Sequence, residues 1–206
     1  MYGTIAFEAS ESSSQGLFKI TLNFSIMRKF VIIISIIILI AIDAISKWFF
    51  HGVFQAMVFG CPYTGTSSIS CVSVADERIL YQYFPLLSDI FGIQLSYNTG
   101  VAFSFHIPGF FLKILTLVLV IAIGVYFVFT EYPKKSKLLD IGYVCILAGA
   151  LSHTYERIFH GYVIDFFSLK YFAIFNFADI IISIGVIFIL FYYFFYDRSD
   201  TATKSK

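Results

Sequence analysis

The sequence predicts a membrane protein of the all-α class, in which four helices cross the bilayer. Of its 206 residues, 59% are hydrophobic and only 13% are charged, and the mean hydropathy is +0.85. A soluble domain carries about 25% charged residues, so this much apolar surface needs lipid as its solvent. The apolar residues gather in four runs of about 20 residues, the length that crosses ~30 Å of hydrocarbon at 1.5 Å per residue.

The four predicted spans are separated by connections of unequal length. The first span is not a cleaved signal peptide, because Asp43 and Lys47 occupy its far end and no small-residue cleavage pattern follows. A long polar-aromatic insert, residues 51–109, separates it from the second span, whereas a short basic turn separates the second from the third. The spans are predicted at residues 30–50, 110–130, 138–159 and 175–196.

The two ends of the chain are predicted to lie outside this membrane domain. Residues 1–26 are mixed in character and rich in serine, and we expect them to form a disordered extension. The functional chain is then expected to begin near Met27. The membrane domain covers residues 27–198, and residues 199–206 form a polar tail.

Basic residues predict how the spans are oriented. Loops rich in Lys and Arg stay in the cytoplasm, and with four spans all the basic segments fall on one side. Both termini are therefore predicted to be cytoplasmic, while the insert 51–109 and residues 160–174 are extracytoplasmic. The basic residues that set this orientation are Arg28, Lys29, Lys134, Lys135, Lys137, Arg198, Lys204 and Lys206.

Several classes of function are not indicated. The net charge of +1 and the lack of a basic, aromatic-interleaved patch give no reason to expect a nucleic-acid partner. No Cys/His spacing resembles a zinc site, and neither a metal nor an organic cofactor is expected. Cys61 and Cys71 share one polar segment, and they either form a disulfide or remain two thiols. Cys145 lies in an apolar run and is expected to be a small buried hydrophobe.

Charged side chains inside the predicted spans are the main indication of function, because each costs roughly 2.5–3.5 kcal/mol on insertion scales. Asp43 and Lys47 are four residues apart on one helix face, and a structural ion pair is favoured over contact with substrate. Glu156 and Arg157 are interpreted as an interhelical clamp. In the four-span topology these residues gather toward the extracytoplasmic side, together with Asp179 and with Asp165 from the adjoining connection.

Asp165 and Asp179 differ from the other charged residues, because each has apolar neighbours and no cation at helical spacing. Two carboxyl groups brought together in an apolar setting cannot both ionise easily, so one keeps a proton. Such a pair can activate water as general acid and general base. Spacing alone leaves a second possibility open, an ion-coupling site in a small membrane carrier.

Four short motifs resemble those of the bacterial lipoprotein signal peptidases, or signal peptidase II. Residues 98–104, beginning Asn98-Thr-Gly, resemble the motif Asn-x-Gly-x-Ala-Phe-Ser of that family. Asp43-x-x-x-Lys47 resembles its first-helix motif. Gly161–Phe166 resembles Gly-x-Val-x-Asp-Phe, and Phe175–Asp179 resembles Phe-Asn-x-Ala-Asp. The motifs occur in the right order relative to four spans, over roughly residues 28–196.

The resemblance implies a site and a substrate. Asp165 and Asp179 would be the catalytic aspartates, with Asn98, Asn176 and Arg157 holding substrate or ordering the site. The substrates would be prolipoproteins of the bacterial inner membrane, cut before a diacylglyceryl-modified cysteine. The implied fold adds a small extracytoplasmic β-structure with a short helix to the four spans.

One part of the insert fits that β-structure. Ile93, Leu95 and Tyr97 alternate with other residues, a pattern typical of a strand. Residues 91–105 are therefore predicted to belong to the small β-structure.

One stretch departs from the family pattern. Where the family usually has Gly-Asn-x-x-Asp-Arg, this chain has Ser152, His153, Glu156 and Arg157. His153 is interpreted either as a tolerated substitution or as a change in substrate choice or pH dependence, since an imidazole can titrate. These departures also leave open a catalytically impaired homologue that binds lipidated peptides.

Overall fold

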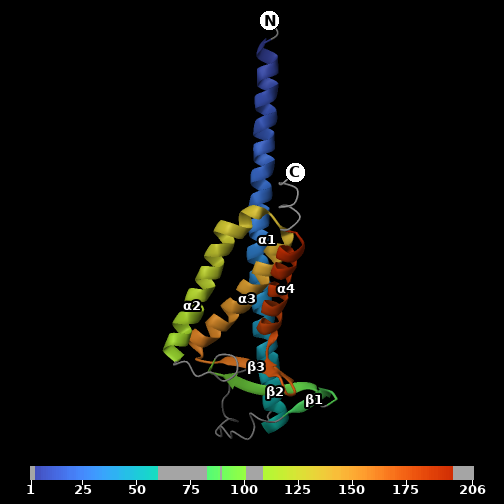
Figure 1. The fold of residues 1–206 in the computed structure, drawn as a ribbon, viewed down its shortest axis with the longest axis vertical. Coiled ribbons are helices and arrows are strands. Elements are labelled where there is room, and N and C mark those ends of the chain that lie inside the picture. The colour runs from blue at the N-terminus through green and yellow to red at the C-terminus, as the bar shows by residue number, and fades with distance from the viewer. Residues whose placement is uncertain (1–2, 60–82, 89, 101–108, 197–206) are drawn as a thin grey trace.

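Four long helices and one small sheet make up the computed structural model, which describes residues 3–59, 83–88, 90–100 and 109–196 (Figure 1). Among the described residues, four helical segments are long and apolar enough to cross a membrane. The fold is therefore the predicted one, a multi-pass membrane protein with a small β-structure. The four segments are Ser25–Phe54, Gly109–Lys134, Lys137–Phe159 and Phe177–Phe195.

Helix bounds lie close to the predicted spans except at α1. Helix α2 covers Gly109–Tyr126 and continues as a π-helical turn, Phe127–Glu131, and a 3₁₀ turn, Tyr132–Lys134. Helix α3 covers Lys137–Phe159 and α4 covers Phe177–Phe195. Large apolar side chains are exposed along all four spans, as expected of surfaces that face lipid.

Helix α1 differs from the prediction at both ends, because it runs without a break over Gly3–Phe59. Residues 3–26 extend the helix instead of forming a disordered segment (Figure 1). Nucleation is the costly step of helix formation, so a span that is already helical extends readily through a segment without proline. At the other end, the connection to the sheet begins after Phe59 instead of at residue 51. Cys61 and Cys71 lie outside the described residues.

Helix α3 is the central helix, with half of its span buried against 11–17% for the other three. It packs on α4 through glycines. A Cβ atom on Gly142 would lie 3.0 Å from the carbonyl oxygen of Gly185, and one on Gly185 would lie 2.6 Å from that of Gly142. Glycine therefore permits the close backbone approach that small residues give in membranes, and it fixes α3 and α4 as one unit. Cys145, on α3, is partly buried.

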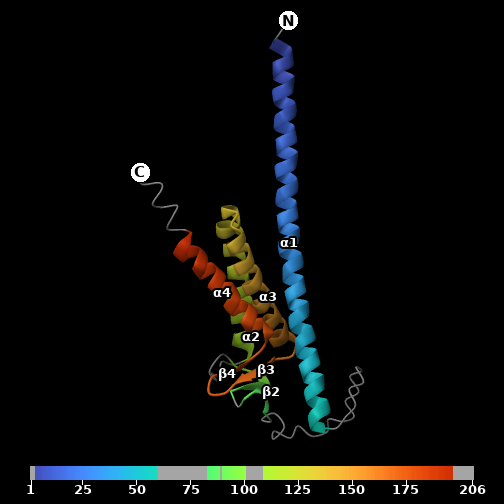
Figure 2. The same ribbon diagram turned by 90° about the vertical axis from the view of Figure 1, so that its right-hand side faces the viewer.

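The sheet lies across one end of the helices (Figures 1 and 2). Its strands are β1 (Phe84–Leu87), β2 (Phe91–Asn98), β3 (Val163–Leu169) and β4 (Ala173–Phe175), antiparallel and paired in chain order. Strand β2 confirms the strand expected from the alternation in the insert, whereas residues 101–108 lie outside the described part. Strands β2 and β3 are central, and Ser96 is paired with Asp165. The sheet thus carries Asp165 on an inner strand beside the helix ends.

The opposite end of the bundle is tied by polar side chains. Arg28 of α1 forms an ion pair with Asp140 of α3 at 2.6 Å and donates to the carbonyl oxygen of Tyr132 at 2.9 Å. Glu131 is fully buried and accepts a hydrogen bond from the Tyr193 hydroxyl at 2.7 Å. These contacts link α1 and α4 to the turn between α2 and α3, so both ends of the bundle are fixed.

Candidate active site

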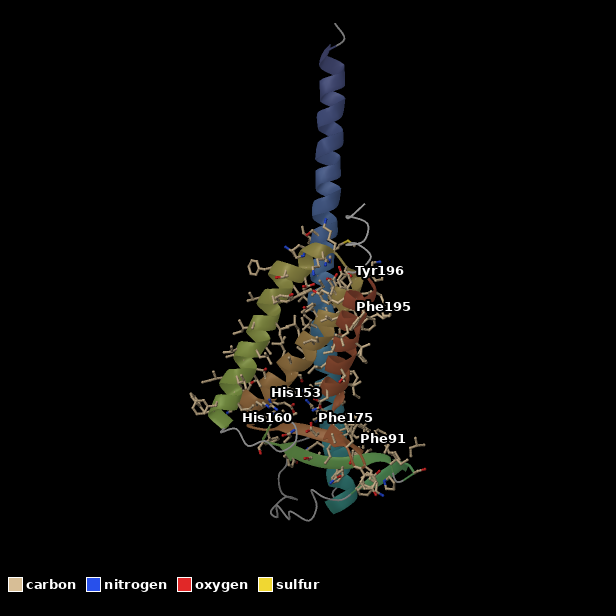
Figure 3. The ribbon with its side chains drawn as sticks, viewed as in Figure 1. Phe91, His153, His160, Phe175, Phe195 and Tyr196 are labelled. Atoms are coloured by element: carbon tan, nitrogen blue, oxygen red, sulfur yellow. The ribbon has the colours of Figure 1, made fainter. Side chains whose placement is uncertain are left out.

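The predicted site residues gather where α1, α3 and α4 meet β3. Figure 3 labels His153 on α3 and Phe175 at the end of β4, both at the level where the helices reach the sheet. Asp165 lies on β3 and is 3% exposed. Asp179 lies in the first turn of α4, with its side chain 44% exposed. The two acids come from different elements, and a single residue between them joins both.

Asn176 is that residue. It is the N-cap of α4, where its side-chain oxygen accepts from the Asp179 backbone N–H at 3.2 Å. The Asp179 carboxylate in turn accepts from the Asn176 backbone N–H at 3.0 Å, which completes a capping box. The Asn176 amide donates to Asp165 Oδ1 at 2.6 Å. One fully buried asparagine therefore starts the helix and holds both carboxyl groups.

Each carboxyl group has one further partner. Asn98, at the end of β2, donates to Asp165 Oδ2 at 3.1 Å and accepts from the Gly100 N–H at 3.0 Å. His153 Nε2 lies 3.1 Å from Asp179 Oδ1. All four carboxylate oxygens of the two aspartates thus have a polar partner, and their positions are fixed before any substrate arrives.

The surroundings of Asp165 favour its protonated form. The pKa of Asp165 is raised from 3.8 to about 6, mainly by burial and next by the nearby charge of Asp179. The hydrogen bonds from Asn98 and Asn176 oppose this, as does the charge of His153, but burial is the largest effect. A carboxyl group with a pKa near neutrality can give or take a proton at physiological pH.

A second polar network contacts the start of α4 beside the two aspartates. Each of its charged side chains has a partner of opposite charge. Lys47 Nζ lies 2.7 Å from Asp43 Oδ2 on the same helix and 2.5 Å from Glu156 Oε2 on α3. Asp43 also accepts from the Ser152 hydroxyl and, at 2.9 Å, from the Ala178 N–H at the start of α4. The pairing predicted for Asp43 and Lys47 is therefore present. Because both side chains are buried and fully engaged in these contacts, a structural role fits them: they hold α1 and α3 to the first turn of α4.

Glu156 and Arg157 act separately and not as one clamp. Glu156 joins α3 to α1 through Lys47, and its other oxygen accepts from the Ile164 N–H at 3.3 Å. Arg157 donates to the carbonyl oxygen of Gly100 at 3.0 Å, while its Nε is buried without a partner in the described part of the chain. Arg157 thus holds the segment that follows Asn98.

Sequence reasoning did not find two of the contacts around the site. His51 of α1 lies 2.8 Å from the Tyr97 hydroxyl of β2, and burial raises the pKa of Tyr97 to about 12. The contact of His153 with Asp179 was also not foreseen. Each joins residues far apart in the chain, and only the packing of helix on helix or on sheet reveals it. The described ranges contain no group of three or more His, Cys, Asp or Glu side chains that could hold a metal.

Comparison with known proteins identifies the family. The family model described as signal peptidase (SPase) II matches residues 32–195, which include the sheet, three complete spans and most of the first span. The chain belongs to the signal peptidase II family. The lipoprotein signal peptidase of Gloeothece citriformis is 38% identical over 123 residues, covering 55% of this chain and 76% of the relative. That of Synechocystis sp. is 41% identical over 115 residues, covering 54% and 70%.

Two solved structures share the fold seen here. Both are described as bacterial membrane enzymes, and both are 22% identical to this chain. One has a TM-score of 0.59 and covers 84% of this chain and 91% of its own; the other has a TM-score of 0.56 and covers 78% and 90%. Because the identity is low, these structures support the four-helix fold with its small sheet and not the details of the site.

Proposed function

We propose that this chain is an aspartic endopeptidase that removes signal peptides from diacylglyceryl-modified prolipoproteins in the bacterial inner membrane. The observation that carries the proposal is the geometry around Asn176. A buried Asp165 with a raised pKa and a more exposed Asp179 are held by the same asparagine. A protonated and an ionised carboxyl group side by side are what hydrolysis by activated water requires.

In the proposed reaction, the ionised carboxylate takes a proton from water as the water oxygen attacks the peptide carbonyl carbon. The protonated carboxyl group gives its proton to the carbonyl oxygen. The first carboxyl group then passes its proton to the leaving nitrogen as the carbon–nitrogen bond breaks. The second recovers its proton from the intermediate, so one water is consumed and the pair returns to its starting state.

The position of the site suits a lipid-anchored substrate. Asp179 lies only one turn inside α4, whose remaining residues are strongly apolar. A precursor with acyl chains in the bilayer presents its cleavage site near the surface of the membrane, and the dyad lies at the corresponding depth. The residues proposed to hold substrate or order the site are Asn98, Asn176, Arg157, Asp43, Lys47, Glu156 and His153.

The proposed orientation places the site on the extracytoplasmic side, with both termini in the cytoplasm. Arg28 and Lys134 lie at the end of the bundle opposite the sheet, with Lys135 next to Lys134 and Lys137 at the start of α3. This distribution of basic residues follows the positive-inside rule. The membrane domain is proposed to cover residues 27–198.

Cleavage by purified protein tests the proposal. The parent, Asp165→Asn and Asp179→Asn are reconstituted in lipid and given a diacylglyceryl-modified prolipoprotein, and the precursor is followed by its shift on a gel. Asp140→Asn is the matched control, because it makes the same change at the far end of α3. We expect cleavage by the parent and the control and by neither dyad variant.

The other outcomes are equally informative. Cleavage at the parental rate by either dyad variant would reject the aspartic mechanism. A folded parent that binds the lipidated peptide without cutting it would instead indicate a catalytically impaired homologue. Ion-dependent uptake of a solute into the same vesicles would indicate a carrier.

A further inference from the structure

The dyad is asymmetric in its hydrogen-bond donors. Among the described residues, the donors to Asp165 are the side-chain amides of Asn98 and Asn176, which cannot carry a charge. Asp179 accepts from a backbone N–H at the N-terminus of α4, where the helix dipole favours an anion, and it contacts the His153 imidazole. The donors and the dipole therefore favour negative charge on Asp179.

His153 is well placed to contribute to this asymmetry. Its side chain is 16% exposed, and its Nε2 lies 3.1 Å from Asp179 Oδ1. Its Nδ1 is buried and has no hydrogen-bond partner among the described residues. The tautomer that fits carries its proton on Nε2 and donates it to the carboxylate. Figure 3 shows His153 on α3, at the end of the helix that reaches the sheet.

The other charged groups around His153 are engaged elsewhere. From α1, Lys47 is held between Asp43 and Glu156. On α3 itself, Arg157 donates to a backbone carbonyl oxygen of the segment after β2. Asp165 on β3 and Asp179 on α4 are the acids of the dyad. Within the described ranges, His153 is therefore the one side chain other than an asparagine amide that is hydrogen-bonded to either aspartate.

We infer that His153 is a positioning residue that keeps Asp179 ionised, so that Asp179 takes the proton from water while Asp165 supplies the proton to the carbonyl oxygen. The inference rests on the proposed function and assigns a role to each acid within it. Burial points the same way, because Asp165 is almost inaccessible and Asp179 is half-exposed.

The pH profile of kcat/KM tests this assignment in the parent, His153→Asn and His153→Gln. The shorter asparagine cannot reach Asp179, whereas the glutamine amide can replace the Nε2 donor. In the asparagine variant Asp179 loses this donor, so the acid limb of the profile, which reports ionisation of Asp179, should move to higher pH. On the acid side of the pH optimum, kcat/KM of the asparagine variant, taken relative to its own maximum, should therefore be lower than that of the parent at the same pH. The glutamine variant should restore the parental shape.

His160→Asn is the matched control, because His160 is exposed at the end of the same helix, outside the dyad. It should leave the profile unchanged. A purely structural role of His153 predicts a uniform loss of activity at every pH with unchanged limbs, and this result would overturn the inference.

A second measurement does not depend on activity. Infrared spectra near pH 5 detect protonated carboxyl groups by their C=O stretch. A band that disappears in Asp165→Asn and persists in Asp179→Asn supports the assignment. As the pH is lowered further, the second band should appear at a higher pH in His153→Asn than in the parent. Loss of the band in Asp179→Asn alone would overturn it. If the parent cuts no precursor, the proposed function fails and the spectra still decide the role of His153.

Discussion

Replacing Asp165 with asparagine should stabilise the protein at alkaline pH while abolishing catalysis. Burial raises the folded-state pKa of Asp165 from 3.8 to about 6. Its contribution to the free energy of unfolding is therefore fully present below pH 4 and is lost as pH rises through about 6. At 1.36 kcal/mol for each tenfold change in proton affinity, the loss is about 3 kcal/mol. Asparagine does not titrate and avoids this loss.

The substitution also costs one hydrogen bond. The size of this cost decides whether the variant is more or less stable than the parent at each pH. Asp165 accepts from two amides, Asn98 and Asn176, whereas an asparagine side chain offers only one acceptor oxygen. One buried donor then lacks a partner, at a cost of about 1–1.5 kcal/mol. Asp165→Asn should thus be about 1 kcal/mol less stable than the parent at pH 4 and about 1.5–2 kcal/mol more stable at pH 8. For a chain of this size the latter is about 3–8 °C in Tm.

Thermal unfolding in detergent at both pH values measures the difference. The informative result is that the stability difference between variant and parent changes sign between pH 4 and pH 8. Detergent shifts the Tm of both proteins alike, so it does not affect this difference. Asp140→Asn serves as the control: it loses the ion pair with Arg28 and should gain no stability at pH 8. Equal destabilisation of Asp165→Asn at both pH values would refute the argument that burial penalises the charge at this position.

Four further predictions concern the site and the bundle. Cleavage should decline as pH rises through about 6, because the reaction needs the proton of Asp165; a pH–rate profile flat from 5 to 8 would contradict this. Lys47→Met should lower the free energy of unfolding by about 3–5 kcal/mol, measured by denaturation, because it leaves two buried carboxylates unpaired. Asn176→Ala should remove the cap of α4, at about 1 kcal/mol, and lower kcat far more than the stability loss explains, as steady-state kinetics would show. Gly185→Val should separate α3 from α4 and lower Tm, whereas Gly109→Ala, with open space around it, should not.

Composition was sufficient to predict the membrane fold, because apolar runs of fixed length have few alternative explanations. The four spans differ from the observed helices by a few residues, apart from α1. Residues 3–26 were expected to be a disordered extension on their serine content, which describes local preference, whereas in the structure they continue α1, as helix propagation from the span allows.

The sequence was sufficient to name the residues of the site but not to predict which of them contact one another. Charged residues in apolar surroundings stand out in a sequence, as Asp165 and Asp179 do. The partners of such residues do not stand out in the same way. Lys47 was expected to pair with Asp43, four residues away, and it also pairs with Glu156 on another helix. The contact of Asn176 with Asp179 follows the Asn-x-x-Asp spacing of a capping box, which the sequence carries. The contact of Asn176 with Asp165 depends on how β3 lies beside the start of α4, which no spacing rule gives.

The central position of α3 has a consequence for how the chain enters the membrane. The span in α3 has a mean hydropathy of 1.3, against 2.3–2.6 for the other three spans. Of the four helices, α3 is therefore the least able to move by itself from the translocation machinery into the bilayer. It carries Glu156 and Arg157, and a charged residue at the centre of a span costs up to roughly 3 kcal/mol on insertion. The partners that offset this cost arrive at different times, since Lys47 precedes α3 in synthesis and the glycine-lined contact with α4 follows it. We therefore expect stable integration of α3 to wait for α4, so that the two helices enter the bilayer as a pair.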